Sequence, residues 1–299
     1  MEKVLVTGAA GFIGNKLIEY FKINNYDVVG WDCCEVQGSE IKKVDLLNET
    51  DVFDNLKKVS PDIVVHCAGS ADVGKSIKNP AMDFNGNVVL THNLLFSLYK
   101  LGLKDTCFVY LSTAGVYGNP VSLPITEDAV VNPLSPYAIH KVMSEDLCKY
   151  FSKTYNMQIK IARIFSAYGA GLKKQIFWDM SKKIKTTGKL EMFGTGNESR
   201  DFIHVNDVVN AIYLIATKDS EYILFNVANG EEVTIRQATE LYAECAGINK
   251  ERITFNNVVK EGDPLNWRAD ISRIKELGYQ KSVDIKQGLL DYNRWIEKL

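Results

Sequence analysis

The chain has 299 residues, with 35 Lys and Arg against 37 Asp and Glu, and 46% of its residues are hydrophobic. This composition is that of a globular protein and excludes an intrinsically disordered chain. The net charge of −2, with no block of Lys or Arg, argues against nucleic acid or an anionic membrane as the main binding partner.

Short apolar runs alternate with longer helical patterns through the first half of the chain. Runs without polar alternation are typical of parallel strands that are covered on both faces. We predict strands at 4–6, 28–31, 63–66, 108–111 and 159–165, and helices at 12–24, 51–59, 83–100 and 136–154. The alternation predicts right-handed βαβ units and an α/β fold with a doubly wound parallel sheet.

The second half of the chain has a less regular pattern. We predict helices at 175–187, 207–217, 235–246 and 285–298, and strands at 190–193 and 223–227. Two long loops, 118–132 and 257–267, are each either part of a binding site or a plain surface excursion. The second loop carries Gly262-Asp263-Pro264.

Cysteine and histidine usage indicates free thiols and predicts no metal site. The 6 cysteines show neither a C-x-x-C pair nor zinc-ligand spacing, and the 4 histidines are scattered. We expect Cys33 and Cys34 to be buried as small apolar groups. The chain starts with Met1-Glu2-Lys3 directly before a strand and has no apolar run of about 18 residues, so we expect a cytoplasmic protein without a signal peptide or membrane span.

A glycine-rich segment joins the first predicted strand to the first predicted helix: Thr7-Gly8-Ala9-Ala10-Gly11-Phe12-Ile13-Gly14. Glycine permits a tight turn and lets backbone N–H groups approach a pyrophosphate, which the helix dipole also favours. The G-x-x-G-x-x-G spacing is one residue wider than the dehydrogenase fingerprint, but its place between strand and helix supports the motif. We predict a dinucleotide site here; the alternative is a βα turn that binds no ligand.

Asp32 at the end of the second predicted strand favours NAD over NADP. It follows the glycine turn at close to the expected spacing of about 20 residues, where a carboxylate accepts hydrogen bonds from the adenosine ribose hydroxyls. The same carboxylate repels a 2′-phosphate, and no Arg follows it before Arg163. Lys42 or Lys43 can still neutralise a phosphate, so NADP is not excluded.

Tyr137 and Lys141 form the candidate catalytic pair. Ser135 suits a helix N-cap and Pro136 a first turn, which places Tyr137 and Lys141 on one helical face. A tyrosine acts as a base near neutral pH only if its pKa falls by roughly three units. The Lys141 ammonium and an oxidised nicotinamide ring both favour the phenolate by opposite charge.

Ser112 and Thr113 follow the strand predicted at 108–111, at the edge of the sheet where ligands bind in open α/β folds. A hydroxyl at this edge can share a hydrogen bond with the substrate oxygen that Tyr137 deprotonates.

Together, the segments 7–14, 112–118, Tyr137-x-x-x-Lys141 and 200–208 resemble the extended short-chain dehydrogenase/reductase family, and within it the NAD-dependent epimerase/dehydratase branch that acts on nucleotide sugars. The resemblance implies a Rossmann-type NAD-binding domain at 1–165 with a return segment near 203–228. A smaller α/β domain at 166–202 and 229–299 would bind a nucleoside-diphosphate sugar. A homodimer, commonly through a helix bundle, is also implied.

The resemblance also implies the role of individual residues. Tyr137 would be the base, Lys141 would bind the nicotinamide ribose and lower the pKa of Tyr137, and Thr113 would be the hydroxyl partner, with Ser112 secondary. The expected substrate-binding residues are Thr113, Tyr137, Ser166 and Arg200, with Arg200 on the diphosphate. The expected cofactor-binding residues are Gly8, Gly11, Phe12, Ile13, Gly14, Asp32, Asp45, Leu46, Cys67, Ala68, Gly69, Asn87, Tyr137 and Lys141.

Two departures from the family pattern bear on the reaction. The hexose 4,6-dehydratases of the family carry Asp-Glu after the threonine for the elimination, whereas this chain has Ala114 and Gly115, which transfer no proton. Ser166 stands where the family usually has an asparagine on the substrate, so the sugar is left open.

The leading hypothesis is a redox-neutral nucleotide-sugar 4-epimerase that works through a transient 4-keto sugar. The alternative is a nucleotide-4-keto-6-deoxyhexose reductase, which uses the same residues with NADH or NADPH. A 4,6-dehydratase is less favoured, and a non-catalytic Rossmann sensor is the least favoured. His140 is expected to pack or face solvent, His204 to be a hydrogen-bonded core residue, and Phe177 and Trp178 to be core residues.

Overall fold

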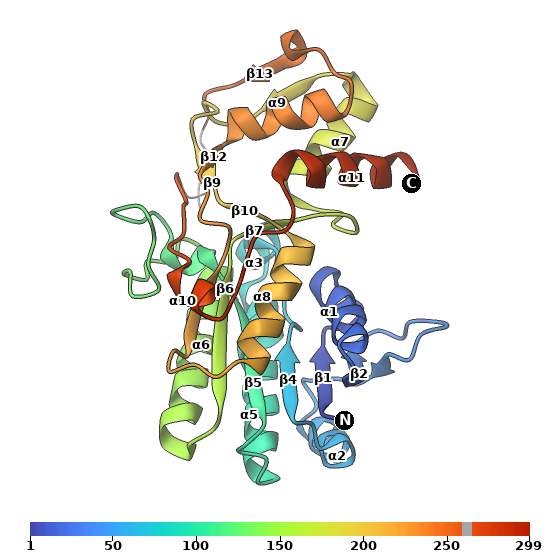
Figure 1. The fold of residues 1–299 in the computed structure, drawn as a ribbon, viewed down its shortest axis with the longest axis vertical. Helices are drawn as coiled ribbons and strands as arrows, with labels where there is room; N and C mark the ends of the chain where they lie inside the picture. Colours follow the sequence, from blue (N-terminus) through green and yellow to red (C-terminus); the bar gives the residue numbers. More distant parts are fainter. Residues whose placement is uncertain (259–264) are drawn as a thin grey trace.

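A parallel β-sheet forms the centre of the computed structural model, which describes residues 1–258 and 265–299 (Figure 1). Within these residues, seven strands lie in the order β11-β6-β5-β4-β1-β2-β3, and neighbouring strands run parallel. They are β1 (Lys3–Thr7), β2 (Asp27–Asp32), β3 (Lys42–Lys43), β4 (Ile63–His66), β5 (Cys107–Thr113), β6 (Ile159–Ile164) and β11 (Leu224–Val227). The order reverses between β1 and β4, which confirms the predicted Rossmann-type doubly wound sheet.

Helices cover both faces of the sheet because its strands are apolar on both sides. Val4 and Val6 of β1 pack in one core cluster with α1 and α8. Leu5 points to the opposite face, into a cluster with α2, α5 and α6. These helices are α1 (Phe12–Ile23), α2 (Glu49–Val59), α5 (Leu90–Lys100), α6 (Pro136–Tyr155) and α8 (Val205–Thr217).

The helix predicted at 83–100 is interrupted. It consists of α4 (Pro80–Phe84), a π-helical segment η1 (Asn85–Val89) and α5. Another short helix, α3 (Val73–Lys78), precedes it and lies outside the predicted elements. A π-helical turn holds one residue more than an α-helical turn and is frequent at functional sites. The extra residue changes the direction in which Asn87 projects from the helix. An apolar sequence pattern alone does not predict a π-helical turn.

Most of the C-terminal part lies beyond the carboxyl ends of the sheet strands, at the top of Figure 1. Three of its helices pack around a third core cluster that includes Phe177, Met180 and Tyr242, and Trp178 packs against it, as expected of core aromatics. The short helix at 272–276 instead packs into the first cluster through Ile274. The elements of the C-terminal part are β7 (Ser166–Tyr168), α7 (Gln175–Thr187), β8 (Leu190–Met192), β9 (Ser199–Arg200), β10 (Phe202–His204), β12 (Val233–Thr234), α9 (Ile235–Cys245), the 3₁₀ turn η3 (Lys250–Arg252), β13 (Ile253–Phe255), α10 (Ser272–Glu276) and α11 (Ile285–Glu297).

The two long loops meet each other. Ile125 of the first loop pairs with Ala269, and Trp267 Nε1 donates a hydrogen bond to the Gly118 carbonyl oxygen across 3.0 Å. The loop 118–132 therefore braces the C-terminal part against the sheet instead of standing free at the surface. Gly262-Asp263-Pro264 of the second loop lie outside the described residues. No helix in the described part of the chain is both long and apolar enough to cross a membrane.

Candidate active site

The glycine turn lies where β1 passes into α1. Gly8 has a φ of +66°, and a Cβ added there would lie 2.7 Å from the Ala68 backbone nitrogen. A Cβ on Gly14 would lie 2.2 Å from the Gly8 carbonyl oxygen, so the turn has no room for side chains at either position. Gly11 is the N-cap of α1 and provides no side-chain hydrogen bond, which leaves the first backbone N–H groups of the helix without a side-chain cap. Uncapped N–H groups at a helix N-terminus suit an anion.

Asp32 lies against this turn. Its Oδ2 accepts a hydrogen bond from the Ala10 backbone N–H across 3.0 Å, and the Ala9 N–H donates to the Trp31 carbonyl oxygen. The ends of β1 and β2 are in register, with Thr7 opposite Trp31. The structure therefore brings together the predicted pyrophosphate turn and the predicted ribose carboxylate.

Asn87 carries an unsatisfied acceptor beside the segment that follows β4. Its Nδ2 donates to the Asp83 carbonyl oxygen, but its Oδ1 is buried and meets no donor among the described residues. A Cβ on Gly69 would lie 2.8 Å from this Oδ1 and 3.6 Å from Lys141 Nζ. The absence of a side chain at Gly69 thus leaves space between two polar groups, and a buried acceptor without a partner is costly unless a ligand donor satisfies it.

The other expected cofactor residues lie at the carboxyl ends of the sheet strands or in the segments that follow these strands. Phe12 and Ile13 open α1 and are half-buried. Cys67 and Ala68 follow β4, and the Ala68 N–H donates to Thr7 Oγ1. Asp45 is exposed in the loop after β3, whereas Leu46 is buried and accepts a hydrogen bond from Asn93.

Tyr137 and Lys141 stand on the first turns of α6. Ser135 caps this helix by accepting a hydrogen bond from the Ala138 N–H, and the Tyr137 N–H donates to Ser76 Oγ of α3. Lys141 is buried, and its Nζ donates to the Leu111 carbonyl oxygen across 2.9 Å. The pair therefore lies at the carboxyl end of β5, next to Thr113.

Burial sets the electrostatics of the pair. It raises the pKa of Tyr137 to about 12, an effect that the Thr113 hydroxyl opposes and the Asp83 carboxylate reinforces. Burial lowers the pKa of Lys141 to about 8, although nearby acidic groups act in the opposite direction. The protein alone thus keeps the phenol protonated, and deprotonation near neutral pH requires additional positive charge beside it.

Ser112 differs from its expected place among the catalytic residues. Its hydroxyl points into the interior and donates to Glu145 Oε1 across 2.6 Å. Glu145 in turn forms a buried ion pair with Arg163, whose Nη2 lies 2.7 Å from Oε2. Because consecutive strand residues face opposite sides, only Thr113 of the two hydroxyls faces Tyr137.

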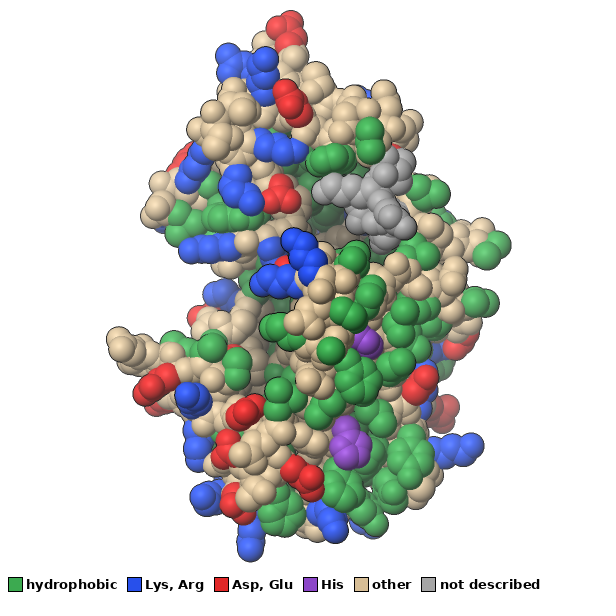
Figure 2. All heavy atoms as spheres, turned by 180° about the vertical axis from the view of Figure 1, so that it is seen from behind, with side chains coloured by type: hydrophobic (Ala, Val, Ile, Leu, Met, Phe, Trp, Pro, Cys, Tyr) green, Lys and Arg blue, Asp and Glu red, His purple; other side chains and the backbone are tan. Residues whose placement is uncertain are grey.

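Ser166 and Arg200 are brought close together in the C-terminal part. The Ser166 N–H donates to the carbonyl oxygen of Asp201, the residue after Arg200. Arg200 Nη1 donates to the Ser199 carbonyl oxygen, and its guanidinium lies 5.5 Å from the centre of the Trp267 ring. Figure 2 shows a notch between the sheet-containing part and the C-terminal part, with Lys and Arg side chains gathered around it.

Sequence comparison places these residues in a known family. Residues 4–228 match the model of the NAD dependent epimerase/dehydratase family. The chain belongs to this family.

Relatives in the epimerase/dehydratase family include more than one kind of enzyme. The UDP-glucuronate 4-epimerase of Thermodesulfobacterium geofontis is 30% identical over 97% of this chain and 95% of its own length. The GDP-6-deoxy-D-mannose reductase of Pseudomonas aeruginosa is also 30% identical, over 96% of this chain and 95% of its own. Among solved structures, the UDP-glucuronic acid 4-epimerase of Bacillus cereus in complex with UDP-glucuronic acid and NAD is 28% identical, covers 99% of both chains and gives a TM-score of 0.88.

A buried pair next to Lys141 was not predicted from the sequence. His140 Nδ1 lies 2.7 Å from Asp83 Oδ2, and both side chains are buried. His140 was expected either to pack or to face solvent; it packs, and its partner lies far away in sequence. His204 is buried as expected, and its Nδ1 accepts a hydrogen bond from the Asn206 N–H.

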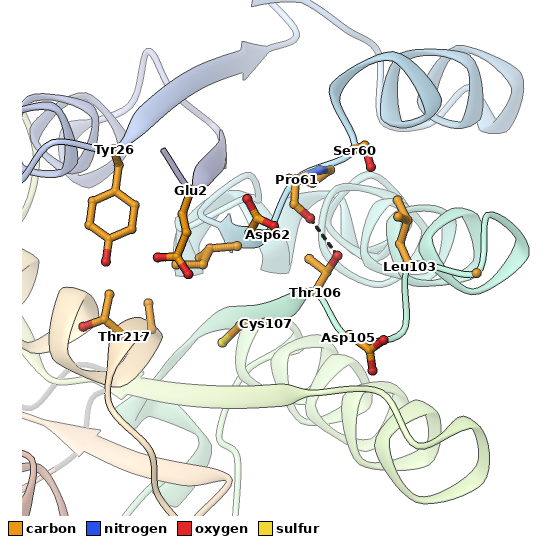
Figure 3. Close-up of a pocket in the computed structure, with 13 residues that line it drawn as sticks. Glu2, Tyr26, Ser60, Pro61, Asp62, Leu103, Asp105, Thr106, Cys107 and Thr217 are labelled. Carbon is orange, nitrogen blue, oxygen red and sulfur yellow. Dashed lines mark hydrogen bonds between the residues drawn. The ribbon is translucent and has the colours of Figure 1, made fainter.

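The pocket in Figure 3 lies away from the candidate active site of this family member. It has a volume of about 440 Å³ and is lined by Glu2, Asp62 and Cys107, which lie at or just before the amino-terminal ends of β1, β4 and β5. Ligands of open α/β sheets bind at the carboxyl ends of the strands, where Tyr137 and the glycine turn lie.

Proposed function

We propose that this protein is an NAD-dependent nucleotide-sugar 4-epimerase. The observation that carries the proposal is the convergence of Thr113, Tyr137 and Lys141 at the sheet edge, with Ala114 and Gly115 where a dehydratase needs proton-transfer groups. Without a group that eliminates water, such a site can oxidise a sugar hydroxyl or reduce a sugar ketone. The reactions that remain are therefore epimerisation and ketone reduction.

The residues present fit NAD. The glycine turn and the N-terminus of α1 would hold the pyrophosphate, Asp32 the adenosine ribose, and Lys141 the nicotinamide ribose. Asn87 Oδ1, buried without a described partner, would accept a hydrogen bond from the same ligand. Bound NAD would supply the acceptor and later the donor of a hydride, and its oxidised ring would supply positive charge beside Tyr137.

Tyr137 and Thr113 would handle the proton. Tyr137 removes the proton of the sugar 4-hydroxyl while the Thr113 hydroxyl hydrogen-bonds the same oxygen. Lys141 lowers the pKa of Tyr137 by opposite charge. The 4-keto sugar then turns in the pocket, and Tyr137 returns the proton to the oxygen of the inverted centre. Arg200 holds the diphosphate, which keeps the intermediate bound while the sugar turns.

We assign residues 1–165 and the return segment near 203–228 to the NAD-binding domain, and 166–202 with 229–299 to the sugar-nucleotide domain. The membership of β11 in the main sheet supports the return segment. A homodimer through α5 and α6 is supported by apolar side chains that these helices expose: Tyr99, Ile139, Met143 and Tyr150.

The experiment is to incubate the purified protein, without added cofactor, with UDP-, dTDP- and GDP-sugars and to analyse the products. The proposal predicts inversion at C4 with no net consumption of NADH. Strict dependence on stoichiometric NADH or NADPH with a 4-keto-6-deoxy sugar would instead establish the reductase, which the 30% identity to GDP-6-deoxy-D-mannose reductase keeps as the second candidate.

A further inference from the structure

Three potential metal ligands converge at the end of β2. Cys33 Sγ lies 3.8 Å from Cys34 Sγ and 3.5 Å from Asp32 Oδ1. One ligand atom from each of the three residues falls within 4.8 Å of the others. Both thiols are exposed, contrary to the expectation that they are buried as small apolar groups.

The separations of Cys33 Sγ from Cys34 Sγ and from Asp32 Oδ1 are those of a tetrahedral zinc site. With Zn–S bonds of about 2.3 Å and a Zn–O bond of about 2.0–2.2 Å, tetrahedral angles place two sulfurs about 3.8 Å apart and a sulfur and an oxygen about 3.5–3.7 Å apart. We propose that Asp32, Cys33 and Cys34 bind one Zn²⁺ ion, with water in the fourth position. Two thiolates and a carboxylate are ligands that a borderline-soft cation accepts.

The surroundings of the three residues are compatible with this ligand set. The Cys34 backbone N–H donates to Asp32 Oδ1 across 3.2 Å and the Ala10 N–H donates to Oδ2, so the carboxylate is held in place before metal binds. Backbone donors of this kind orient a ligating carboxylate. Binding releases one proton from each thiol to solvent and leaves the site with a net charge of −1, so the affinity rises with pH.

The site shares Asp32 with the cofactor pocket. Because the carboxylate cannot coordinate Zn²⁺ and accept hydrogen bonds from a ribose in the same geometry, metal and NAD bind competitively. This competition rests on the proposed role of Asp32 in NAD binding, whereas the metal site does not. The protein would therefore lose activity in the presence of a thiophilic cation and regain it with a chelator.

Titration of the full-length protein, freed of bound NAD and kept reduced by a phosphine, tests the site. Cd²⁺ is the probe, followed by its thiolate charge-transfer absorption, and Zn²⁺ is titrated against a chromophoric chelator. We expect one ion per chain and an affinity at least about 10-fold weaker in Cys33→Ser and in Cys34→Ser. Both positions are exposed, so the variants should fold; Cys245→Ser is the matched control and should bind as the parent protein does. Unchanged binding in both variants, or no charge-transfer band, would overturn the proposal.

A second titration separates the metal site from the cofactor proposal. NAD is titrated with and without saturating Zn²⁺ in the parent protein and in the Cys33→Ser/Cys34→Ser double variant. We expect Zn²⁺ to raise the apparent Kd for NAD only in the parent protein. If Zn²⁺ binds but leaves the Kd unchanged, the shared use of Asp32 is wrong. Failure of NAD to bind in the absence of metal would count against the cofactor proposal, not against the metal site.

Discussion

The hydroxyl of Ser112 donates a hydrogen bond to Glu145 in the interior, across 2.6 Å, while that of its neighbour Thr113 interacts with Tyr137. The two residues end the same strand and carry similar groups, but the pleat of β5 turns them to opposite sides. One hydroxyl therefore serves the buried Glu145–Arg163 ion pair, and the other serves the candidate active site.

Replacing these two hydroxyls separately should have different effects on kcat. Ser112→Ala removes a partner of a buried carboxylate, so we expect the free energy of unfolding to fall by about 1–3 kcal/mol with little change in kcat. Thr113→Val should lower kcat by up to about 10-fold for the lost hydrogen bond to the substrate oxygen. It also removes the hydrogen bond that the Gly115 N–H donates to Thr113 Oγ1, so we expect the free energy of unfolding to fall by about 0.5–2 kcal/mol. Urea unfolding and steady-state kinetics measure both effects. A larger loss of kcat in Ser112→Ala than in Thr113→Val would contradict the assignment.

Asn87→Ala should weaken cofactor binding. The buried Oδ1 has no donor among the described residues, so we expect the loss of one ligand hydrogen bond to raise the Kd for NAD by up to about 10-fold. Isothermal titration calorimetry measures the Kd. The control is Asn55→Ala on α2, where the amide already bonds Asp51 and Lys42. This control should lose stability and keep its affinity; equal Kd values in the two variants would remove Asn87 from the cofactor site.

The buried ammonium of Lys141 should make a contribution to stability that rises with pH. Its pKa is about 8 in the folded chain against 10.5 for an ordinary lysine, so above pH 8 the folded state binds fewer protons than the unfolded state. The contribution of Lys141 to the free energy of unfolding therefore increases between about pH 8 and 10. The thiols of Cys67, Cys107 and Cys148 contribute in the opposite direction over this range, because burial raises their pKa values above that of a free cysteine. Above pH 10, Tyr137 also opposes the contribution of Lys141 because its pKa is raised to about 12.

Lys141→Met tests this linkage. The variant should be more stable than the parent protein at pH 7, and the difference in free energy of unfolding between the two proteins should shrink between pH 8 and 10. Urea unfolding at constant ionic strength gives both values. Parallel pH profiles for the two proteins would show that the ammonium is not desolvated.

Local patterns predicted the elements that carry the site. The uninterrupted apolar runs gave β1, β2, β4, β5 and β6, because a strand covered on both faces needs no polar alternation. Ser135 and Pro136 located the start of α6, since capping depends on adjacent residues. The two- and three-residue strands of the C-terminal part carry too few residues to show a pattern.

Contacts between segments that lie far apart in the chain were not predicted from the sequence. The partner of Ser112 is 33 residues away on α6, and that of His140 is 57 residues away on α4. The π-helical segment around Asn87 was not predicted either, because its apolar residues fit an ordinary α-helix equally well. Cys33 and Cys34 were expected in the core on their residue type, yet the bend after β2 exposes both.

The fate of the hydrogen at C4 of the sugar tests the epimerase proposal most directly. A nucleotide sugar that the protein turns over is prepared with deuterium at C4, and the product is analysed by mass spectrometry and NMR. We expect an inverted product that keeps its deuterium at C4, and turnover reduced by about 10²- to 10⁴-fold in Tyr137→Phe. Deuterium found in released, reduced cofactor would contradict the epimerase proposal. A product whose C4 hydrogen comes from added NADH or NADPH would contradict it as well.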